Sequence, residues 1–231
     1  VKKNETVGLV GESGCGKTTL GRAILQLINV NSGKIILNGK DLSLLSAAEK
    51  RILRREMQVI FQDPYGSLNP RISIGNAITE PLNVHGLYNT KKQRKEKAVE
   101  LLEKVNLRAD LFNRFPYQFS GGQRQRICIA RALALEPSFI IFDESVSALD
   151  VSVQAQVLNL ISDLKASHHF TSIFISHDLS VVHYISDRIM VMQQGKIVEE
   201  GPAEKIYVNP QQEYTRQLIA AIPGRKIAYS T

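Results

Sequence analysis

Eight consecutive residues, Gly11 to Thr18, have the types and spacing of a phosphate-binding loop. Their sequence, GESGCGKT, matches the pattern G-x-x-x-x-G-K-[ST] in full. Glycines let backbone N–H groups converge on phosphate oxygens, and a helix N-terminus adds its positive dipole end. Lys17 is expected to reach the β- and γ-phosphates, and the Thr18 hydroxyl to bind Mg²⁺. The predicted nucleotide-binding residues are Gly11, Glu12, Ser13, Gly14, Cys15, Gly16, Lys17, Thr18 and Thr19.

The segments on either side of this loop are those that such a site requires. Thr6–Val10 has the composition of a buried strand, and apolar residues at helical spacing predict a helix over Lys17–Ile28. A glycine-rich turn that happens to precede Lys-Thr is the alternative. The flanking strand and helix favour the phosphate loop.

A pair of carboxylates follows a second buried strand, Phe139–Phe142. Asp143 is expected at the carboxyl end of this strand, where α/β sheets bind ligands, and could hold Mg²⁺ through water. Glu144 could orient and deprotonate an attacking water. A strand that ends in two solvated acids is the alternative, but the phosphate loop upstream favours the catalytic interpretation.

The remaining pattern predicts strands that alternate with helices, and therefore a largely parallel α/β sheet. A loop-rich stretch is expected after Asp63, where Pro64, Gly66, Pro70, Gly75 and Pro81 interrupt the chain. The other expected strands are 35–37, 57–61, 171–175, 189–192 and 197–198, and the other expected helices are 91–107, 121–135 and 153–164.

The composition is that of an ordinary globular protein. The 231 residues are 43% hydrophobic and 22% charged, which excludes disorder, collagen and a disulfide scaffold, and no apolar stretch approaches a membrane span. Cys15 and Cys128 match no metal spacing and fit a reducing cytoplasm. Because the sequence begins at Val1 without a methionine, we expect a fragment whose start is missing.

The net charge of +7 leaves room for an acidic partner. Part of it is a basic cluster over residues 91–97, which opens a helical pattern. This cluster is predicted to be the solvated face of that helix; a nucleic-acid patch is less favoured, because no aromatic residues interleave with the basic ones.

Phe119–Gln123, with the sequence FSGGQ, resembles the LSGGQ signature of ABC-type ATPases, and Arg124–Leu133 is similar to the helix that follows it. The resemblance implies that Ser120, Gly121, Gly122 and Gln123 contact the γ-phosphate of a nucleotide bound to a second cassette. It also implies that Gln62 binds Mg²⁺ and water, and that His177 lies at the γ-phosphate. Ser147 and Asp150 look like the D-loop. The implied catalytic residues are Glu144, His177 and Gln62, and the implied metal ligands are Thr18, Gln62 and Asp143.

The same resemblance, over essentially the whole chain, implies a P-loop NTPase (RecA-like) core. It has a mostly parallel sheet, an antiparallel β part and an inserted α-helical subdomain. The core would comprise 1–63 and 137–231, truncated at its N-terminus, and the helical signature subdomain 64–136. The upstream strands that carry an adenine-stacking aromatic are missing, so reduced nucleotide affinity is expected.

Partners follow from the resemblance as well. Two cassettes would pack head to tail with ATP and Mg²⁺ between them, and would drive transmembrane permease subunits from the cytoplasmic face of the membrane. The cassette itself would bind neither cargo nor nucleic acid.

Gln62–Arg71 and Asp143–Val157 are similar to dipeptide and oligopeptide importers, and so is a tail with Pro210, Tyr214, Thr215, Leu218 and Pro223. Peptide import is therefore the preferred function. Import of nickel, glutathione or another cargo is an alternative. A soluble ABC ATPase that acts on nucleic acid or ribosomes is another, and a phosphate-binding regulator without turnover is disfavoured by Glu144 and His177.

Overall fold

The computed structural model describes residues 1–222, apart from the side chain of Ala47. The chain divides into two compact units. The first unit comprises 1–32, 141–144 and the chain from Thr171 onward, and the second comprises 33–140 and 145–170. Pro223, the last residue of the predicted tail pattern, lies outside the described residues. The predicted subdomain boundaries at 64 and 136 stay a prediction.

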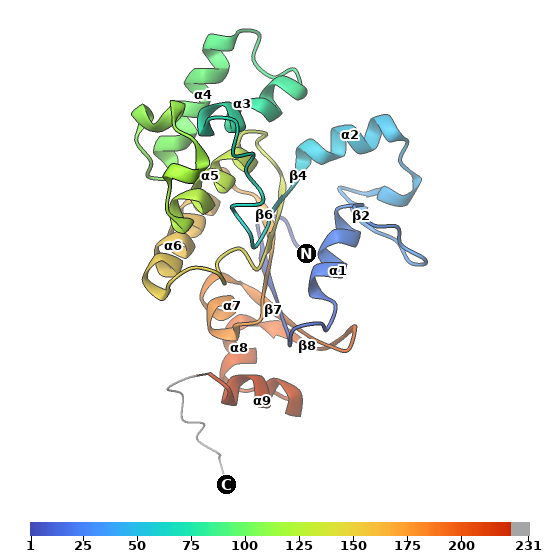
Figure 1. The fold of residues 1–231 in the computed structure, drawn as a ribbon. Coiled ribbons are helices and arrows are strands. Elements are labelled where there is room, and N and C mark those ends of the chain that lie inside the picture. Colours follow the sequence, from blue (N-terminus) through green and yellow to red (C-terminus); the bar gives the residue numbers. More distant parts are fainter. Residues whose placement is uncertain (223–231) are drawn as a thin grey trace. The chain divides into compact units, whose positions relative to one another are not determined.

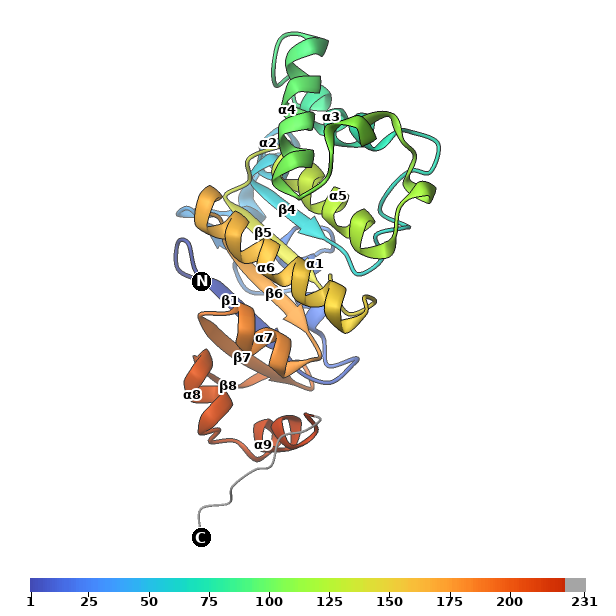
Figure 2. The ribbon, with the colours of Figure 1, turned by 90° about the vertical axis from the view of Figure 1, so that its left-hand side faces the viewer.

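The first unit is built on a sheet whose central strand is β1 (Thr6–Val10). β1 pairs in parallel with β6 (Thr171–Ser176) on one side and with β7 (Arg188–Gln193) on the other. β8 (Lys196–Pro202) is antiparallel to β7 and follows it through a tight turn. The end of β5 (Phe139–Asp143) lies beyond β6, which gives the order β5-β6-β1-β7-β8 (Figure 2). Figure 1 labels β6, β7 and β8 of the same sheet.

This strand order decides where the chemistry can occur. β1 and β6 are parallel, and Asp143 at the end of β5 accepts a hydrogen bond from Thr18, so the segments that follow Val10, Asp143 and Ser176 meet at one edge of the sheet. Every residue of β1 is buried, as expected for a central parallel strand covered on both faces. The helices of this unit are α1 (Lys17–Ile24), α7 (Leu179–Ile185), α8 (Ala203–Val208) and α9 (Glu213–Ala220).

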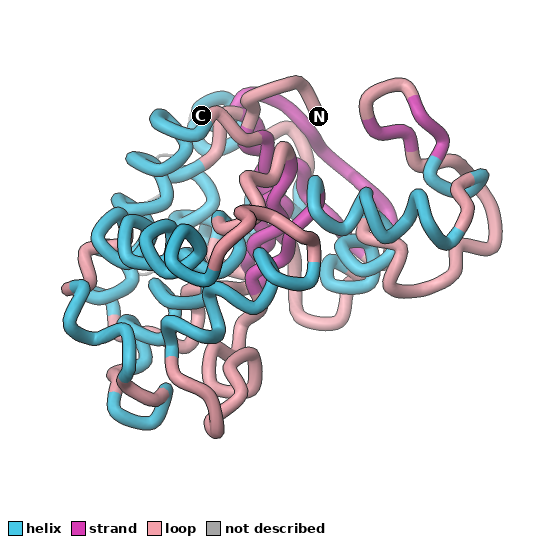
Figure 3. The backbone as a smooth tube through the Cα atoms, turned by 90° about the horizontal axis from the view of Figure 1, so that it is seen from above, coloured by secondary structure: helices cyan, strands magenta, loops and turns pink. Residues whose placement is uncertain are grey.

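The second unit is mainly helical. It begins with a two-stranded hairpin of β2 (Ile36–Leu37) and β3 (Lys40–Asp41), which Figure 3 shows as a separate pair of strands. Its other elements are η1 (Leu42–Leu44), α2 (Ala47–Glu56), β4 (Met57–Ile60), α3 (Ile74–Val84), α4 (Lys91–Lys104), η2 (Ala109–Asn113), η3 (Pro116–Gln118), α5 (Gly121–Leu133), α6 (Val151–His168) and the first residues of β5.

Two sequence-based expectations about helices were wrong. In the loop-rich stretch expected after Asp63, Gly75 and Pro81 do not interrupt the chain, because both lie inside α3. Ile74, Ile78 and Leu82 are fully buried at a spacing of four residues, and this burial outweighs the local cost of Gly and Pro. The helix expected over Lys17–Ile28 ends at Ile24, because Gln26 adopts a positive φ of 55°.

The expected strands at 57–61, 139–142, 171–175 and 189–192 are confirmed to within about a residue at each end. The expected helices at 91–107 and 121–135 end two or three residues early, and α6 extends beyond the expected 153–164 at both ends. Among the described residues, none of the helices is long and apolar enough to cross a membrane.

Candidate nucleotide-binding site

The loop Gly11–Thr18 connects β1 to α1, as its sequence predicts. Gly14 and Gly16 have φ of 81° and 108°, a left-handed region that other residues rarely adopt. Gly11 is required for a different reason, because a Cβ there would lie 2.1 Å from the backbone oxygen of Met192. The loop is also held by the N–H of Gly195, which donates to the Cys15 carbonyl at 2.9 Å.

The Lys17 side chain lies inside the loop rather than in solvent. Lys17 is only 4% exposed, and its Nζ donates to the carbonyl oxygens of Gly11 at 2.7 Å and Glu12 at 2.8 Å. A phosphate would offer a charged acceptor in place of these neutral carbonyls, and hydrogen bonds to charged groups are the stronger kind. The arrangement therefore places an ammonium group where the loop could bind phosphate.

Thr18 and Asp143 meet at the edge of the sheet. The Thr18 hydroxyl donates to Asp143 Oδ1 at 3.0 Å. Burial raises the pKa of the Asp143 carboxyl, and the neighbouring Glu144 adds to the effect, while the hydrogen bond from Thr18 lowers the pKa. A hydroxyl and a carboxylate side by side fit Mg²⁺, which takes few protein ligands and keeps several waters. A cation there would offset the cost of burying the Asp143 charge.

Glu144 and His177 are brought together although 32 residues separate them in the chain. Glu144 Oε2 lies 3.5 Å from His177 Nδ1, with the Glu144 side chain 18% exposed and that of His177 54% exposed. Glu144 adopts a positive φ of 49°, and its N–H donates to the Ile175 carbonyl at 2.9 Å. A non-glycine residue with positive φ is strained and marks a position worth testing for function.

The other predicted site residues lie in the second unit. Gln62 follows β4, and Ser147 and Asp150 precede α6, of which Asp150 is the N-cap. Ser120 caps α5: its Oγ accepts from the Gln123 N–H at 3.3 Å, and Gln123 Oε1 accepts from the Ser120 N–H at 3.0 Å. This capping box fixes the first turn of α5.

The same helix α5 holds the segment that follows Gln62. Arg131 Nη1 donates to the Ser67 carbonyl at 2.5 Å, and Cys128 Sγ lies 3.9 Å from the Pro64 carbonyl. The Arg124 guanidinium stacks over the Tyr65 ring at 5.1 Å from its centroid. One face of α5, the helix that Ser120 caps, therefore contacts three residues of the Pro64–Ser67 turn.

Sequence reasoning missed one contact at the loop. The Glu12 N–H donates to the Tyr214 hydroxyl at 2.9 Å, so a residue of α9 contacts the phosphate loop directly. Tyr214 belongs to the tail pattern, but that pattern was interpreted only as a family resemblance. A buried tyrosine, here 8% exposed, needs a polar partner for its hydroxyl, but only the tertiary structure shows that Tyr214 is buried.

The fold and the loop define a P-loop nucleotide-binding protein. The family model described as "ABC transporter" matches residues 1–147, which is more than half of the sequence. The chain belongs to the ABC transporter family and has the architecture of its ATPase cassettes.

Two peptide-transport proteins and one solved cassette are similar to this chain over most of its length. The chain is 53% identical to the oligopeptide transport ATP-binding protein OppF of Bacillus subtilis (strain 168), with 96% of this chain and 73% of that protein covered. It is 52% identical to the dipeptide transport ATP-binding protein DppF of Lactococcus lactis subsp. cremoris (strain MG1363), covering 97% and 72%. The ATP-binding cassette MJ0796, solved as a dimer in a post-hydrolysis state with ADP and Pi, has a TM-score of 0.77 and 28% identity over 88% and 87% of the chains.

Proposed function

We propose that this chain binds and hydrolyses ATP as the energising subunit of a peptide importer. The observation that carries the proposal is the cluster at one sheet edge. There the Lys17 loop, the Thr18–Asp143 pair and the Glu144–His177 pair lie where β1, β5 and β6 end in one unit. The similarity to oligopeptide and dipeptide transport proteins supports peptide as the cargo.

Each group of this cluster has a role that its environment supports. Lys17 and the loop N–H groups bind the phosphates, and Thr18 and Asp143 hold Mg²⁺, which would neutralise phosphate charge. Glu144 accepts a proton from the attacking water. His177, within 3.5 Å of Glu144, orients that carboxylate and meets the γ-phosphate.

The remaining residues are assigned to a pair of cassettes. Ser120, Gly121, Gly122 and Gln123 complete the site of a second cassette, Ser147 and Asp150 line the boundary between the two, and Gln62 contacts the Mg²⁺ and the water. The solved dimer of a related cassette supports pairing. We further propose that the pair acts on permease subunits at the cytoplasmic face of the membrane, with 64–136 as the signature subdomain.

The variant Glu144→Gln tests the catalytic assignment. It keeps the size of the side chain and removes the base, so phosphate release should fall by about 10²–10⁴-fold while MgATP binding persists. Glu200→Gln, on an exposed residue of β8 in the same unit, is the matched control and should hydrolyse ATP at the parent rate. Hydrolysis by Glu144→Gln at the parent rate would show that Glu144 is not the base.

The importer assignment needs its own measurement. The protein, purified from membranes of cells that express it, should bring permease subunits with it, and a strain without it should lose uptake of a labelled peptide. Recovery with ribosomes or DNA alone would instead support the soluble alternative. Peptide uptake that is unchanged, with uptake of nickel or glutathione lost, would correct the cargo.

A further inference from the structure

The tail pattern around Tyr214 reaches the nucleotide loop. The Tyr214 hydroxyl accepts a hydrogen bond from the Glu12 N–H at 2.9 Å, across 202 positions of sequence. Both residues belong to the first unit. The tyrosine is 8% exposed and its neighbour Thr215 is fully buried, so this end of α9 is packed against the unit rather than solvated. The contact joins a C-terminal helix to the second residue of the phosphate loop.

The helix that carries Tyr214 is itself anchored to the sheet. The Glu199 carboxylate accepts from the backbone N–H groups of Gln211 at 2.7 Å and Gln212 at 3.1 Å, directly before α9. Glu199 lies on β8, which pairs with β7, and β7 pairs with β1. The tyrosine and the loop are therefore both attached to the same sheet, which fixes the position of one relative to the other.

Glu12 is held at both of its backbone polar groups. Tyr214 binds its N–H, and Lys17 Nζ donates to its carbonyl at 2.8 Å. Nucleotide binding would break the hydrogen bond from Lys17 to the Glu12 carbonyl, because phosphate competes for the Lys17 ammonium. The hydrogen bond between Tyr214 and the Glu12 N–H does not involve the Lys17 ammonium, so phosphate binding to Lys17 would leave it in place. A tyrosine hydroxyl is neutral at physiological pH, and burial raises the pKa of Tyr214 further above that range.

We propose that Tyr214 is a positioning residue for the phosphate loop, which holds Glu12 in place while Lys17 exchanges loop carbonyls for nucleotide phosphate. The tail pattern thereby becomes part of the nucleotide site. The effect on nucleotide binding rests on the proposed function. The effect on the loop backbone does not, because it is a property of the chain without nucleotide.

Tyr214→Phe removes the hydroxyl and keeps the ring that packs. We expect MgADP affinity to fall about fivefold and the KM for MgATP to rise by a similar factor, while kcat changes by less than about twofold. A merely structural role would lower the active fraction and kcat without changing KM. Tyr184→Phe, on a 60% exposed residue of α7 in the same unit, is the matched control and should keep both constants.

Hydrogen exchange at the Glu12 amide provides a readout that needs no nucleotide. Exchange should be faster in Tyr214→Phe than in the parent and unchanged in Tyr184→Phe. Glu199→Gln weakens the anchor of α9 and should shift exchange in the same direction as Tyr214→Phe. Unchanged exchange and an unchanged KM in Tyr214→Phe would overturn the inference. Faster Glu12 exchange in a chain that binds no MgATP would support the positioning role and refute the proposed function alone.

Discussion

The Thr18 hydroxyl donates to the Asp143 carboxylate at 3.0 Å, although 125 positions separate the two residues in the sequence. The contact exists because β1 and β5 end at the same edge of the sheet, with β6 between them. It joins the phosphate loop to the buried strand that carries the acids. An anion-binding loop beside a buried acid is a suitable place for a cation.

Replacing Thr18 by valine should weaken the use of Mg²⁺. Valine has nearly the shape of threonine but no hydroxyl, so Asp143 would lose the donor that now faces it. We expect the Mg²⁺ concentration for half-maximal ATP hydrolysis to rise at least about tenfold. Thr79→Val, on α3 in the second unit, controls for the loss of a threonine hydroxyl. An unchanged Mg²⁺ requirement would remove Thr18 from the metal site.

Gly122 should prove structural as well as functional. A Cβ at this position would lie 2.3 Å from Val153 Cγ1, because α5 and α6 pack closely there. Gly122→Ala should lower the free energy of unfolding by about 1–3 kcal/mol. Urea denaturation of the double variant with Val153→Ala should show recovery of part of that loss, since the clashing methyl is gone. If the losses of unfolding free energy in the two single variants simply add in the double variant, Gly122 and Val153 are not in close contact.

The contact of Arg131 with the Pro64–Ser67 turn should control access to Cys128. Burial raises the pKa of the Cys128 thiol to about 11, so at pH 8 the parent should react slowly with a maleimide. Arg131→Gln removes the guanidinium that donates to Ser67, and it also removes a charge that lowers the pKa of the Cys128 thiol. We expect the gain in access to outweigh the higher thiol pKa, so labelling should become faster. Peptide mass spectrometry would separate Cys128 from Cys15. Arg126→Gln, on the same helix but bonded to Gln156, should leave the labelling rate unchanged.

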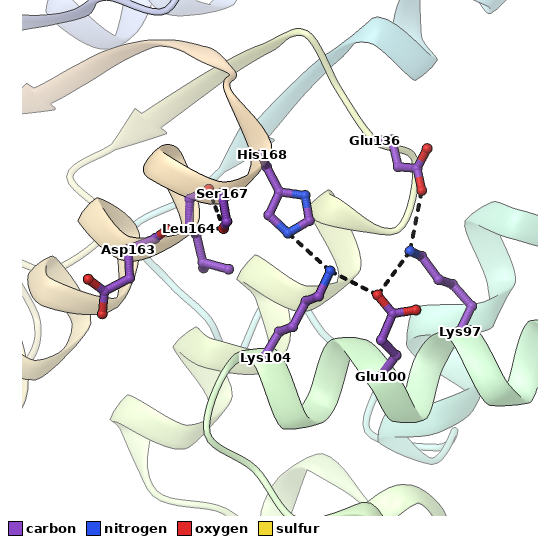
Figure 4. Close-up of polar contacts among 8 residues, drawn as sticks. All are labelled: Lys97, Glu100, Lys104, Glu136, Asp163, Leu164, Ser167 and His168. Atoms are coloured by element: carbon purple, nitrogen blue, oxygen red, sulfur yellow. Dashed lines mark hydrogen bonds and ion pairs between the residues drawn. The ribbon is translucent and has the colours of Figure 1, made fainter.

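His168 should make stability dependent on pH. Its Nε2 lies 3.4 Å from Lys104 Nζ, in a cluster with Lys97, Glu100 and Glu136 (Figure 4). Burial lowers the pKa of His168, and the charges of Lys104 and Lys97 lower it further, against the smaller opposing effects of Glu136 and Glu100.

The direction of the effect follows from this lowered pKa. The unfolded chain protonates this histidine near the ordinary value of about 6.5, and the folded chain only at a lower pH. The contribution of neutral His168 to the free energy of unfolding is therefore fully present above pH 6.5 and is lost as the pH falls toward its folded-state pKa. Urea unfolding at pH 8 and pH 5.5 should show a smaller difference for His168→Gln than for the parent. His169→Gln, on the exposed neighbour, controls for the loss of a histidine.

Much of the fold could be predicted because its signals are local. Val7–Val10 and Phe139–Phe142 are each apolar over four positions, and both lie in strands. The prediction was wrong for α3, where Gly75 and Pro81 indicate a loop. A Cβ at Gly75 would lie 2.4 Å from the Phe112 ring, so the glycine serves close packing rather than a turn. Local propensity cannot distinguish these two uses of glycine.

The sequence by itself determined the phosphate loop, because its glycines, Lys17 and Thr18 lie within eight consecutive residues. The glycines set the conformation of that short stretch of backbone. Only the tertiary structure decided that Glu144 faces His177 and that Glu12 binds Tyr214. Those contacts join residues tens to hundreds of positions apart, and they depend on which strands become neighbours in the sheet. Strand order follows from packing of the whole unit, which no short pattern of residues encodes.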